Sequence, residues 1–271
     1  MKKLLVTLLL LTTVQLCNAQ QVLKQVMTLK MPGELGSRSA AVVWHPTQKK
    51  YYTAFCGNET FPFAIFDSKG VLLNKAATTN YDIRGMWYNT KSKNLEFNCF
   101  DSVGIGHYEL DKAGFKVSEV LDKERFDQPT PHSVGVFIPK DNQLMFINND
   151  FDVSTFDATT YEAVPSKYGF LIGQKKALAK DAVMLSDEER YALYDARNNT
   201  QILYTGLPNG EFAVLNIELK VIELYNAKTG LISKTLKLPS TITLETGFCF
   251  SYANGIWWIF SIGNRQWVGY K

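Results

Sequence analysis

The sequence predicts an all-β protein made of repeated short strands, on three observations. A strand–turn–strand pattern recurs along the chain, and each copy joins two apolar strands through a polar turn. Most copies are followed by a third strand that ends in Asp or Asn, such as Ala64–Asp67. A turn and a fourth, more polar strand then follow, as in Val71–Ala76. Repeats of about 40–50 residues built in this way are typical of radial β-architectures.

Five hairpins carry the pattern. They are Ala41–Trp44 with Tyr51–Phe55, Gly85–Tyr88 with Leu95–Phe97, Gly135–Phe137 with Leu144–Ile147, Ala182–Leu185 with Tyr191–Tyr194, and Phe248–Phe250 with Ile256–Phe260. Strands that are apolar on both faces fit between neighbouring sheets, and the polar fourth strand can meet water at the outer edge. Each repeat therefore describes one blade of a β-propeller.

The number of blades depends on how residues 160–240 are divided. Tyr191–Tyr194 can pair backward with Ala182–Leu185 or forward with Gln201–Tyr204, and Phe212–Leu215 with Val221–Leu224 forms a further hairpin. Counting that hairpin gives six blades of about 42 residues each, an ordinary blade size. We expect six blades, with five as the alternative.

Two similar segments predict how the ring closes. Thr28-Leu-Lys-Met-Pro32 precedes the first repeat, and Thr235-Leu-Lys-Leu-Pro239 precedes the last. The last repeat stops at Trp267–Tyr270, a third strand with no fourth behind it. We expect the N-terminal strand Val22–Leu29 to complete this blade, which leaves no open sheet edge where the chain ends meet.

The N-terminus has the pattern of a signal peptide over residues 1–19. Lys2 and Lys3 precede the apolar run Leu4–Leu11, and Cys17-Asn-Ala19 supplies small residues for cleavage. The run is too short to span a bilayer. We expect an exported protein, periplasmic or extracellular, with one propeller domain over residues 20–271. A lipoprotein anchored through Cys17 is the alternative.

Charge and cysteine content exclude some classes of protein. Without Lys2 and Lys3 the formal charge falls from +3 to +1, which gives no electrostatic footprint for nucleic acid. Cys56, Cys99 and Cys249 are an odd, sparse set, so we expect buried free thiols, with a Cys56–Cys99 bridge as the alternative.

The hairpin and Asp-turn pattern resembles the six-bladed propeller superfamily of NHL-repeat and regucalcin/gluconolactonase-like proteins, over nearly the whole mature chain. Gly33-Glu34 followed by Val43-Trp44 is loosely similar to the start of the lactonases, although the spacing is longer here. That resemblance implies a metal-dependent lactonase-type hydrolase, with Glu34 as a ligand of one divalent ion such as Ca²⁺. The chain contains no HExxH, CxxC, GxSxG or P-loop motif.

Candidate ligand-binding residues lie where the chain enters the innermost strands, because these segments line the central funnel of a propeller. They are Arg38, Asp82, Arg84, His132, Glu211 and Glu245. Arginine and histidine from successive blades can converge on an anion, since guanidinium donors match carboxylate or phosphate. Alternatively, the charged residues pair with one another across the rim. A second oxygen-rich cluster, Asn148–Asp152, suits Ca²⁺ or a polar turn.

We therefore expect an exported binding or scaffold propeller rather than an enzyme, and no cofactor. Its partner would be a protein, peptide, glycan or small anionic molecule.

Overall fold

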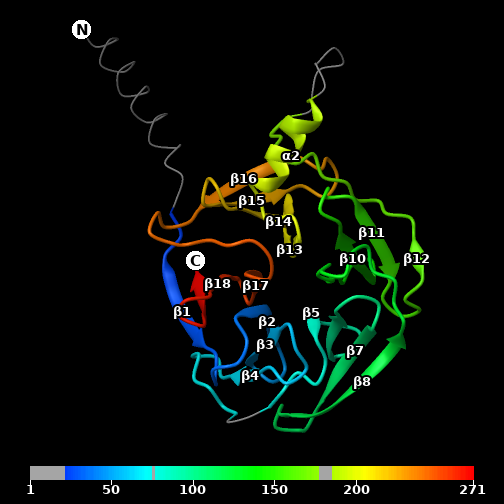
Figure 1. Ribbon diagram of the computed structural model, residues 1–271, viewed down its shortest axis with the longest axis vertical. Coiled ribbons are helices and arrows are strands. Elements are labelled where there is room, and N and C mark those ends of the chain that lie inside the picture. The colour runs from blue at the N-terminus through cyan, green and yellow to red at the C-terminus, as the bar shows by residue number, and fades with distance from the viewer. Residues whose placement is uncertain (1–21, 75–76, 177–184) are drawn as a thin grey trace, which may run out of the picture.

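The computed structural model describes residues 22–74, 77–176 and 185–271. These residues form five antiparallel sheets arranged around a central axis, which makes the fold a β-propeller (Figure 1). The strands of successive blades, innermost first, are β2 (Arg38–His45), β3 (Lys50–Cys56) and β4 (Phe63–Phe66); β5 (Ile83–Tyr88), β6 (Leu95–Cys99), β7 (Gly104–Leu110) and β8 (Lys116–Glu124); β9 (Val136–Ile138), β10 (Gln143–Ile147), β11 (Val153–Asp157) and β12 (Ala163–Val164); β13 (Leu203–Leu207), β14 (Gly210–Asn216), β15 (Val221–Tyr225) and β16 (Ile232–Lys237); and β17 (Phe250–Ala253), β18 (Ile256–Ser261), β19 (Gln266–Tyr270) and β1 (Gln25–Lys30).

The ring closes through the N-terminal strand, as the sequence predicted. β1 pairs antiparallel with β19, with Leu29 opposite Trp267 and Thr28 opposite Val268. Val22 forms one further bridge, to Lys237 of the neighbouring blade. The first strand of the described chain therefore completes the last blade, and Figure 1 shows it beside the C-terminus.

The prediction of six blades is wrong, because the described residues form five. Tyr191–Tyr194, expected to be a strand, lie in the helix α2 (Asp187–Asp195). Ser186 caps this helix: its Oγ accepts a hydrogen bond from the Glu189 N–H, and the Glu189 carboxylate accepts one from the Ser186 N–H. Part of the partner strand, residues 182–184, lies outside the described residues.

The other strands of residues 201–240 form one blade. The predicted hairpin of Phe212–Leu215 with Val221–Leu224 is present, as β14 and β15. Its innermost strand is β13, which pairs with β14 through Leu203 opposite Ala213. The segment before β13 therefore runs as a helix and loop, and it contributes no blade of its own in the described residues.

Aromatic side chains fill the wedges between neighbouring blades. Between the last blade and the first, Tyr51 lies 5.3 Å from Trp258 and Phe55 lies 5.7 Å from Phe260, measured between ring centroids. All four rings are at most 2 % exposed. Large rings suit this position because each fills the space between two twisted sheets, which accounts for the 13 % aromatic content.

Buried asparagines join the blades near the axis. The Asn98 Oδ1 accepts a hydrogen bond from the Gly135 N–H at 3.0 Å, and its Nδ2 donates to the Ser133 carbonyl at 2.9 Å. Asn198 makes the same reciprocal pair with one residue, Gly247, at 3.0 and 2.8 Å. Each amide satisfies buried backbone groups of the next blade, so it fixes the start of that blade's innermost strand.

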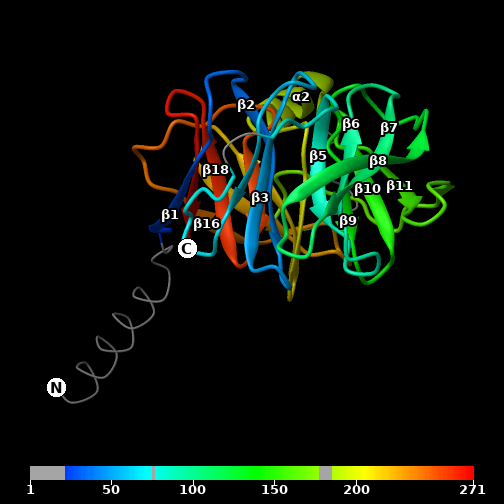
Figure 2. The same ribbon diagram turned by 90° about the horizontal axis from the view of Figure 1, so that it is seen from below.

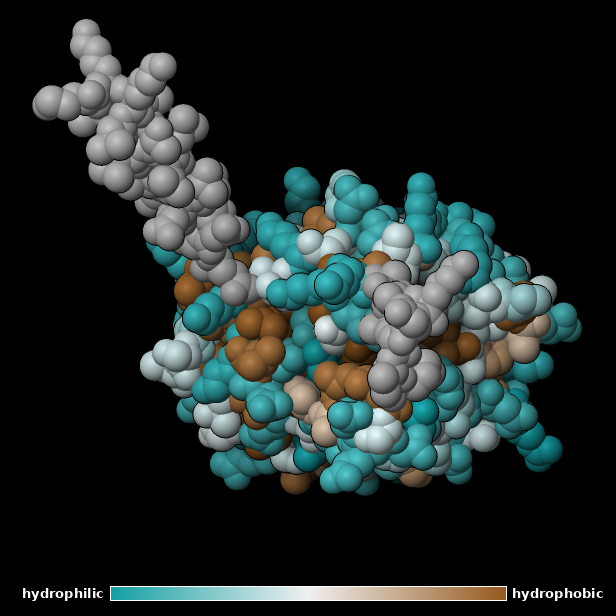
Figure 3. Space-filling model, turned by 90° about the horizontal axis from the view of Figure 1, so that it is seen from above, coloured by the Kyte–Doolittle hydropathy of each residue, from teal (hydrophilic) through white to brown (hydrophobic). Residues whose placement is uncertain are grey.

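Cys56, Cys99 and Cys249 are free and buried, as predicted. Burial raises the pKa of Cys56, Cys99 and Cys249 to about 12 each, so these thiols are unreactive at neutral pH. Within the described ranges, no helix is long and apolar enough to cross a membrane. The predicted signal peptide and Cys17 lie outside the described residues. The side of the ring seen in Figure 3 is largely hydrophilic, with apolar side chains in small patches.

Candidate functional site

The propeller has a hollow at each end of its axis. One hollow is lined by residues at or just before the starts of the five innermost strands, and the other by residues further along these strands; Figure 2 shows the ring from the side. We call the hollow at the starts the upper hollow; it measures about 690 Å³ and is lined by Arg38, Arg84, His132 and Arg197 among others. The lower hollow, lined by Trp44, Tyr88, Tyr204 and Tyr252 among others, measures about 370 Å³. Both sizes fall within the range of small-molecule sites.

Three of the predicted residues, Arg38, Arg84 and His132, line the upper hollow together. They come from the starts of the first three blades, which is the placement that the sequence indicated. A third arginine, Arg197, joins them from the segment between α2 and β13. The lining therefore holds three guanidinium groups and one imidazole.

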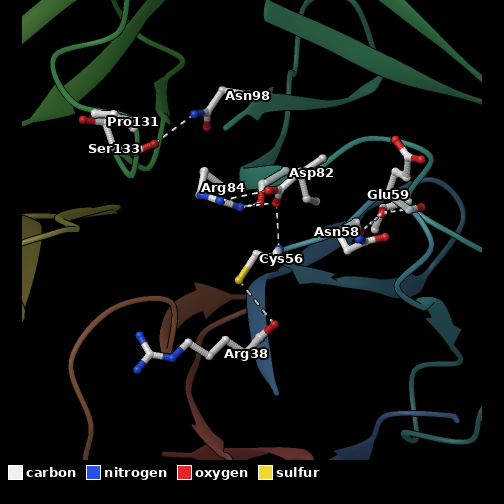
Figure 4. A network of polar contacts seen from close by, with 12 residues as sticks. Arg38, Cys56, Asn58, Glu59, Asp82, Arg84, Asn98, Pro131 and Ser133 are labelled. Atoms are coloured by element: carbon white, nitrogen blue, oxygen red, sulfur yellow. Dashed lines mark hydrogen bonds and ion pairs between the residues drawn. The ribbon is translucent and has the colours of Figure 1, made fainter. Parts of the chain in front are cut away.

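Arg84 is held in a fixed position. Its guanidinium forms an ion pair with Asp82, in which Nη2 donates to Oδ2 at 3.0 Å (Figure 4). The ring of Phe100 stacks on this guanidinium, with the ring centroid 4.4 Å from Cζ. Asp82 also accepts a hydrogen bond from the Gly57 N–H at 2.7 Å. Arg84 is 5 % exposed, and its Nε has no hydrogen-bond partner in the described part of the chain. The predicted alternative, pairing at the rim, thus holds for Asp82 and Arg84.

Arg38 differs from the other two arginines because its charge is unpaired. Its backbone carbonyl accepts a hydrogen bond from the Cys56 thiol at 3.3 Å, while its guanidinium extends away with no polar partner among the described residues (Figure 4). It passes close over Gly247, where an added Cβ would lie 2.9 Å from Nη1. The side chain is exposed, so its donors are available to a ligand.

Arg197 was not predicted from the sequence. It is bound on one side by Glu223, whose two carboxylate oxygens accept from Nε and Nη2 at 2.8 Å each. Its Nη1 donates to the Leu193 carbonyl at 2.6 Å. Both members of the pair are at most 5 % exposed at their side chains, and Glu223 also accepts from Asn216 and Tyr225. This network positions Arg197 firmly at the wall of the hollow.

His132 completes the lining from the third blade. It is exposed, and its ring lies 5.3 Å from the ring of Phe100, which also stacks on Arg84. The acidic side chain of the lining is Asp195, at the end of α2, which is exposed. The upper hollow therefore combines an unpaired cation, two braced guanidinium groups and one free carboxylate.

The remaining predicted residues lie outside this lining. Glu245 is half-buried and directly precedes Thr246, which does line the hollow. The Glu245 carbonyl accepts a hydrogen bond from the Cys249 thiol at 2.7 Å. Glu211 was placed at the start of an innermost strand, but it lies in the second strand β14 and accepts from the Ala227 N–H at 3.0 Å. This misplacement follows from the wrong division into six blades.

Glu34, the candidate metal ligand, lies exposed in the loop before β2 and does not line the upper hollow. In the Asn148–Asp152 cluster, the Asn148 Oδ1 accepts from the N–H groups of Asp150 and Asp152 at 2.9 Å each, so this segment is a polar turn. Within residues 22–74, 77–176 and 185–271, no three His, Cys, Asp or Glu side chains are grouped to hold a metal ion.

The chain has no detectable relative by sequence among the proteins compared, but it resembles a solved structure. No protein-family model matches the chain, and no curated protein matches it. Among solved structures, the chain is similar to an auxiliary nutrient binding protein from Bacteroides thetaiotaomicron, with 13 % sequence identity and a TM-score of 0.45. The match covers 88 % of this chain and 60 % of that protein, so the chain spans less than two thirds of its length.

Proposed function

We propose that the protein is an exported binding propeller whose upper hollow takes a small anionic ligand, preferably one that carries a carboxylate. The single observation that carries this proposal is the unpaired guanidinium of Arg38, which lies in the same hollow as Arg84, His132 and Arg197. A guanidinium presents a planar fork of donors that matches a carboxylate with two parallel hydrogen bonds.

The charges around the upper hollow favour binding of an anionic ligand over a cationic one. The carboxylates of Asp82 and Glu223 are already committed to Arg84 and Arg197. Both of these arginines are braced, so they lose little freedom when a ligand approaches. Arg38 supplies the one positive charge of the lining that no carboxylate pairs with among the described residues. The exposed carboxylate of Asp195 can accept a hydrogen bond from a hydroxyl or ammonium group on the same ligand.

The size and walls of the upper hollow favour a small molecule as its ligand. The volume of about 690 Å³ lies in the middle of the range for ligand pockets, and the walls come from several blades of a closed ring. Such walls cannot move far without disturbing the packing between blades, so the site is largely formed before binding. We expect binding without catalysis, with export to the periplasm or the outside of the cell.

A thermal-shift screen of small anions tests this proposal. The panel holds succinate, citrate, glucuronate, glutamate and inorganic phosphate, each at millimolar concentration in low salt, with the neutral alcohols of similar size as controls. A ligand that binds only the folded protein raises its melting temperature, so we expect at least one carboxylate to do so. A panel in which no anion shifts the transition more than the neutral controls would contradict the proposal.

A further inference from the structure

The lower hollow is a second concavity, separate from the upper one. It is lined by the innermost strands of all five blades, and the two linings have no residue in common. Its chemistry also differs. Where the upper hollow carries three arginines, no residue that lines the lower hollow has a formal charge at neutral pH. A ligand that prefers the lower hollow must therefore be uncharged.

Four half-buried aromatic side chains from four blades form its wall: Trp44, Tyr88, Tyr204 and Tyr252. Each is braced by a second ring, with centroids 4.2–5.5 Å apart; the pairs are Trp44 with Tyr51, Tyr88 with His45, Tyr204 with Phe212, and Tyr252 with Trp257. The rings are thus fixed before a ligand arrives and offer firm apolar surfaces at low entropic cost.

Uncharged hydrogen-bonding groups accompany the rings. Thr90 and Asn254 line the hollow toward the last residues of the innermost strands. Thr205 also lines it, but its hydroxyl already donates to a backbone carbonyl and accepts from a backbone N–H of the same hairpin. The Asn254 Nδ2 donates to the Tyr51 hydroxyl at 2.8 Å. At the inner end of the lining, Gln201 is 2 % exposed, and its Oε1 has no hydrogen-bond partner in the described part of the chain. A buried acceptor of this kind is costly unless a donor reaches it.

We infer that the lower hollow binds a neutral sugar unit, either free or at the end of an uncharged glycan. A sugar ring has apolar C–H faces that stack on aromatic side chains and a rim of hydroxyls that donate and accept hydrogen bonds. This combination matches four rings, an amide acceptor without a donor and several hydroxyls in an uncharged hollow. A volume of about 370 Å³ suits one or two sugar rings rather than a long chain.

The geometry separates this occupant from a proline-rich peptide, which also stacks on aromatic rings. A polyproline helix lies lengthwise in an open groove, whereas the lower hollow is ringed by the innermost strands of five blades and opens at the end of the axis. It admits the end of a molecule rather than its side. The hydroxyls of Tyr204 and Tyr252 are neutral at neutral pH and able to donate, and burial raises their pKa further.

The experiment is a titration of the mature protein with cellobiose, maltose, lactose and N,N′-diacetylchitobiose, followed by saturation-transfer NMR and tryptophan fluorescence. Trp44 and Trp87 line the hollow and report on stacking. We expect at least one disaccharide to bind at millimolar concentration. Tyr252→Ala should weaken it about tenfold, because one stacked ring is lost, and Tyr252→Phe should restore most of the affinity.

Two matched variants keep the test decisive. Tyr204→Ala removes a ring from another blade, so it gives the same answer if Tyr252→Ala does not fold. Arg38→Ala belongs to the upper hollow and should leave sugar affinity unchanged. The inference is overturned if none of the four disaccharides binds, if binding depends on Arg38 rather than on Tyr252 or Tyr204, or if hexaproline binds in their place.

Discussion

Replacing Leu29 by alanine tests the closure of the ring through β1. Leu29 lies opposite Trp267 in the strand pair that joins the two ends of the chain, and its side chain is 0 % exposed. Removing a fully buried leucine side chain costs about 2–5 kcal/mol, part from lost burial and part from the cavity left behind. We expect about 3 kcal/mol, since the rigid Trp267 ring beside it limits collapse into the cavity.

The assay is urea denaturation followed by tryptophan fluorescence. Trp267 is itself fully buried next to β1, so it reports directly on this blade. Val26 provides the matched control because it lies on the same strand and is 49 % exposed. Val26→Ala should change the free energy of unfolding by less than about 0.5 kcal/mol.

The loss in Leu29→Ala should appear as a lower denaturation midpoint with an unchanged slope, because the whole ring still unfolds in one step. Deleting residues 20–31 should have a larger effect and abolish the cooperative transition. If Leu29→Ala is no less stable than Val26→Ala, or if the truncated chain keeps the full transition, β1 does not hold the ring closed.

Three further predictions concern buried polar groups and thiols. Asn198→Ala should cost about 1–3 kcal/mol of unfolding free energy, since it leaves the buried Gly247 N–H and carbonyl unpaired; an unchanged urea midpoint would contradict this. Burial raises the pKa of Glu96 in the folded state, so the folded protein binds this proton more tightly than the unfolded chain does. The protonated carboxyl therefore adds to the free energy of unfolding below pH 4.5, and this contribution is lost as the pH rises through the pKa of the folded state. Glu96→Gln should therefore flatten the dependence of the melting temperature on pH above 4.5, and an unaltered profile would show that Glu96 does not cause it. Thiol titration of denatured, unreduced protein that lacks residues 1–19 should find three free thiols, from Cys56, Cys99 and Cys249; finding one would mean that two are bridged.

The strand pattern of the ring could be predicted from the sequence because the blades repeat it locally. In the first hairpin, Trp44 lies opposite Tyr51 across the polar turn, as the pattern of two apolar strands joined by a polar turn predicted. Closure was also predictable, since the segments beginning at Thr28 and Thr235 repeat the same five-residue pattern. Both are outer strands, and β16 and β1 occupy equivalent outermost positions in their sheets.

The number of blades could not be predicted correctly because one short apolar segment fits two structures. Tyr191-Ala-Leu-Tyr194 has the composition of a strand, but it follows Ser186 with Glu189 three residues later, a pattern that begins helices. The acidic residues of the first turn, Asp187 to Glu189, favour the helix further through its dipole. The capping signal was therefore present in the sequence, but the resemblance of this segment to the apolar strands of the other hairpins outweighed it.

The candidate site was predictable in part for the same reason. Arg38, Arg84 and His132 share a hollow because each stands at the start of an innermost strand in a blade that was divided correctly. Arg197 was missed because it follows the misread helix, and its partner Glu223 lies 26 residues further on in β15, so that sequence spacing gives no sign of the pair. The wall of the lower hollow was missed because its rings resemble ordinary core residues.

The dissociation constant of the tightest-binding carboxylate from the screen, measured by calorimetry in wild type and Arg38→Ala, tests the proposed function most directly. Losing a hydrogen bond to a charged group costs about 1.5–3 kcal/mol, so Arg38→Ala should weaken binding about tenfold to hundredfold. Lys234→Ala, which removes an exposed charge from the outermost strand β16, should leave the constant unchanged. Equal constants for wild type and Arg38→Ala would contradict the account, because the unpaired guanidinium would then take no part in binding.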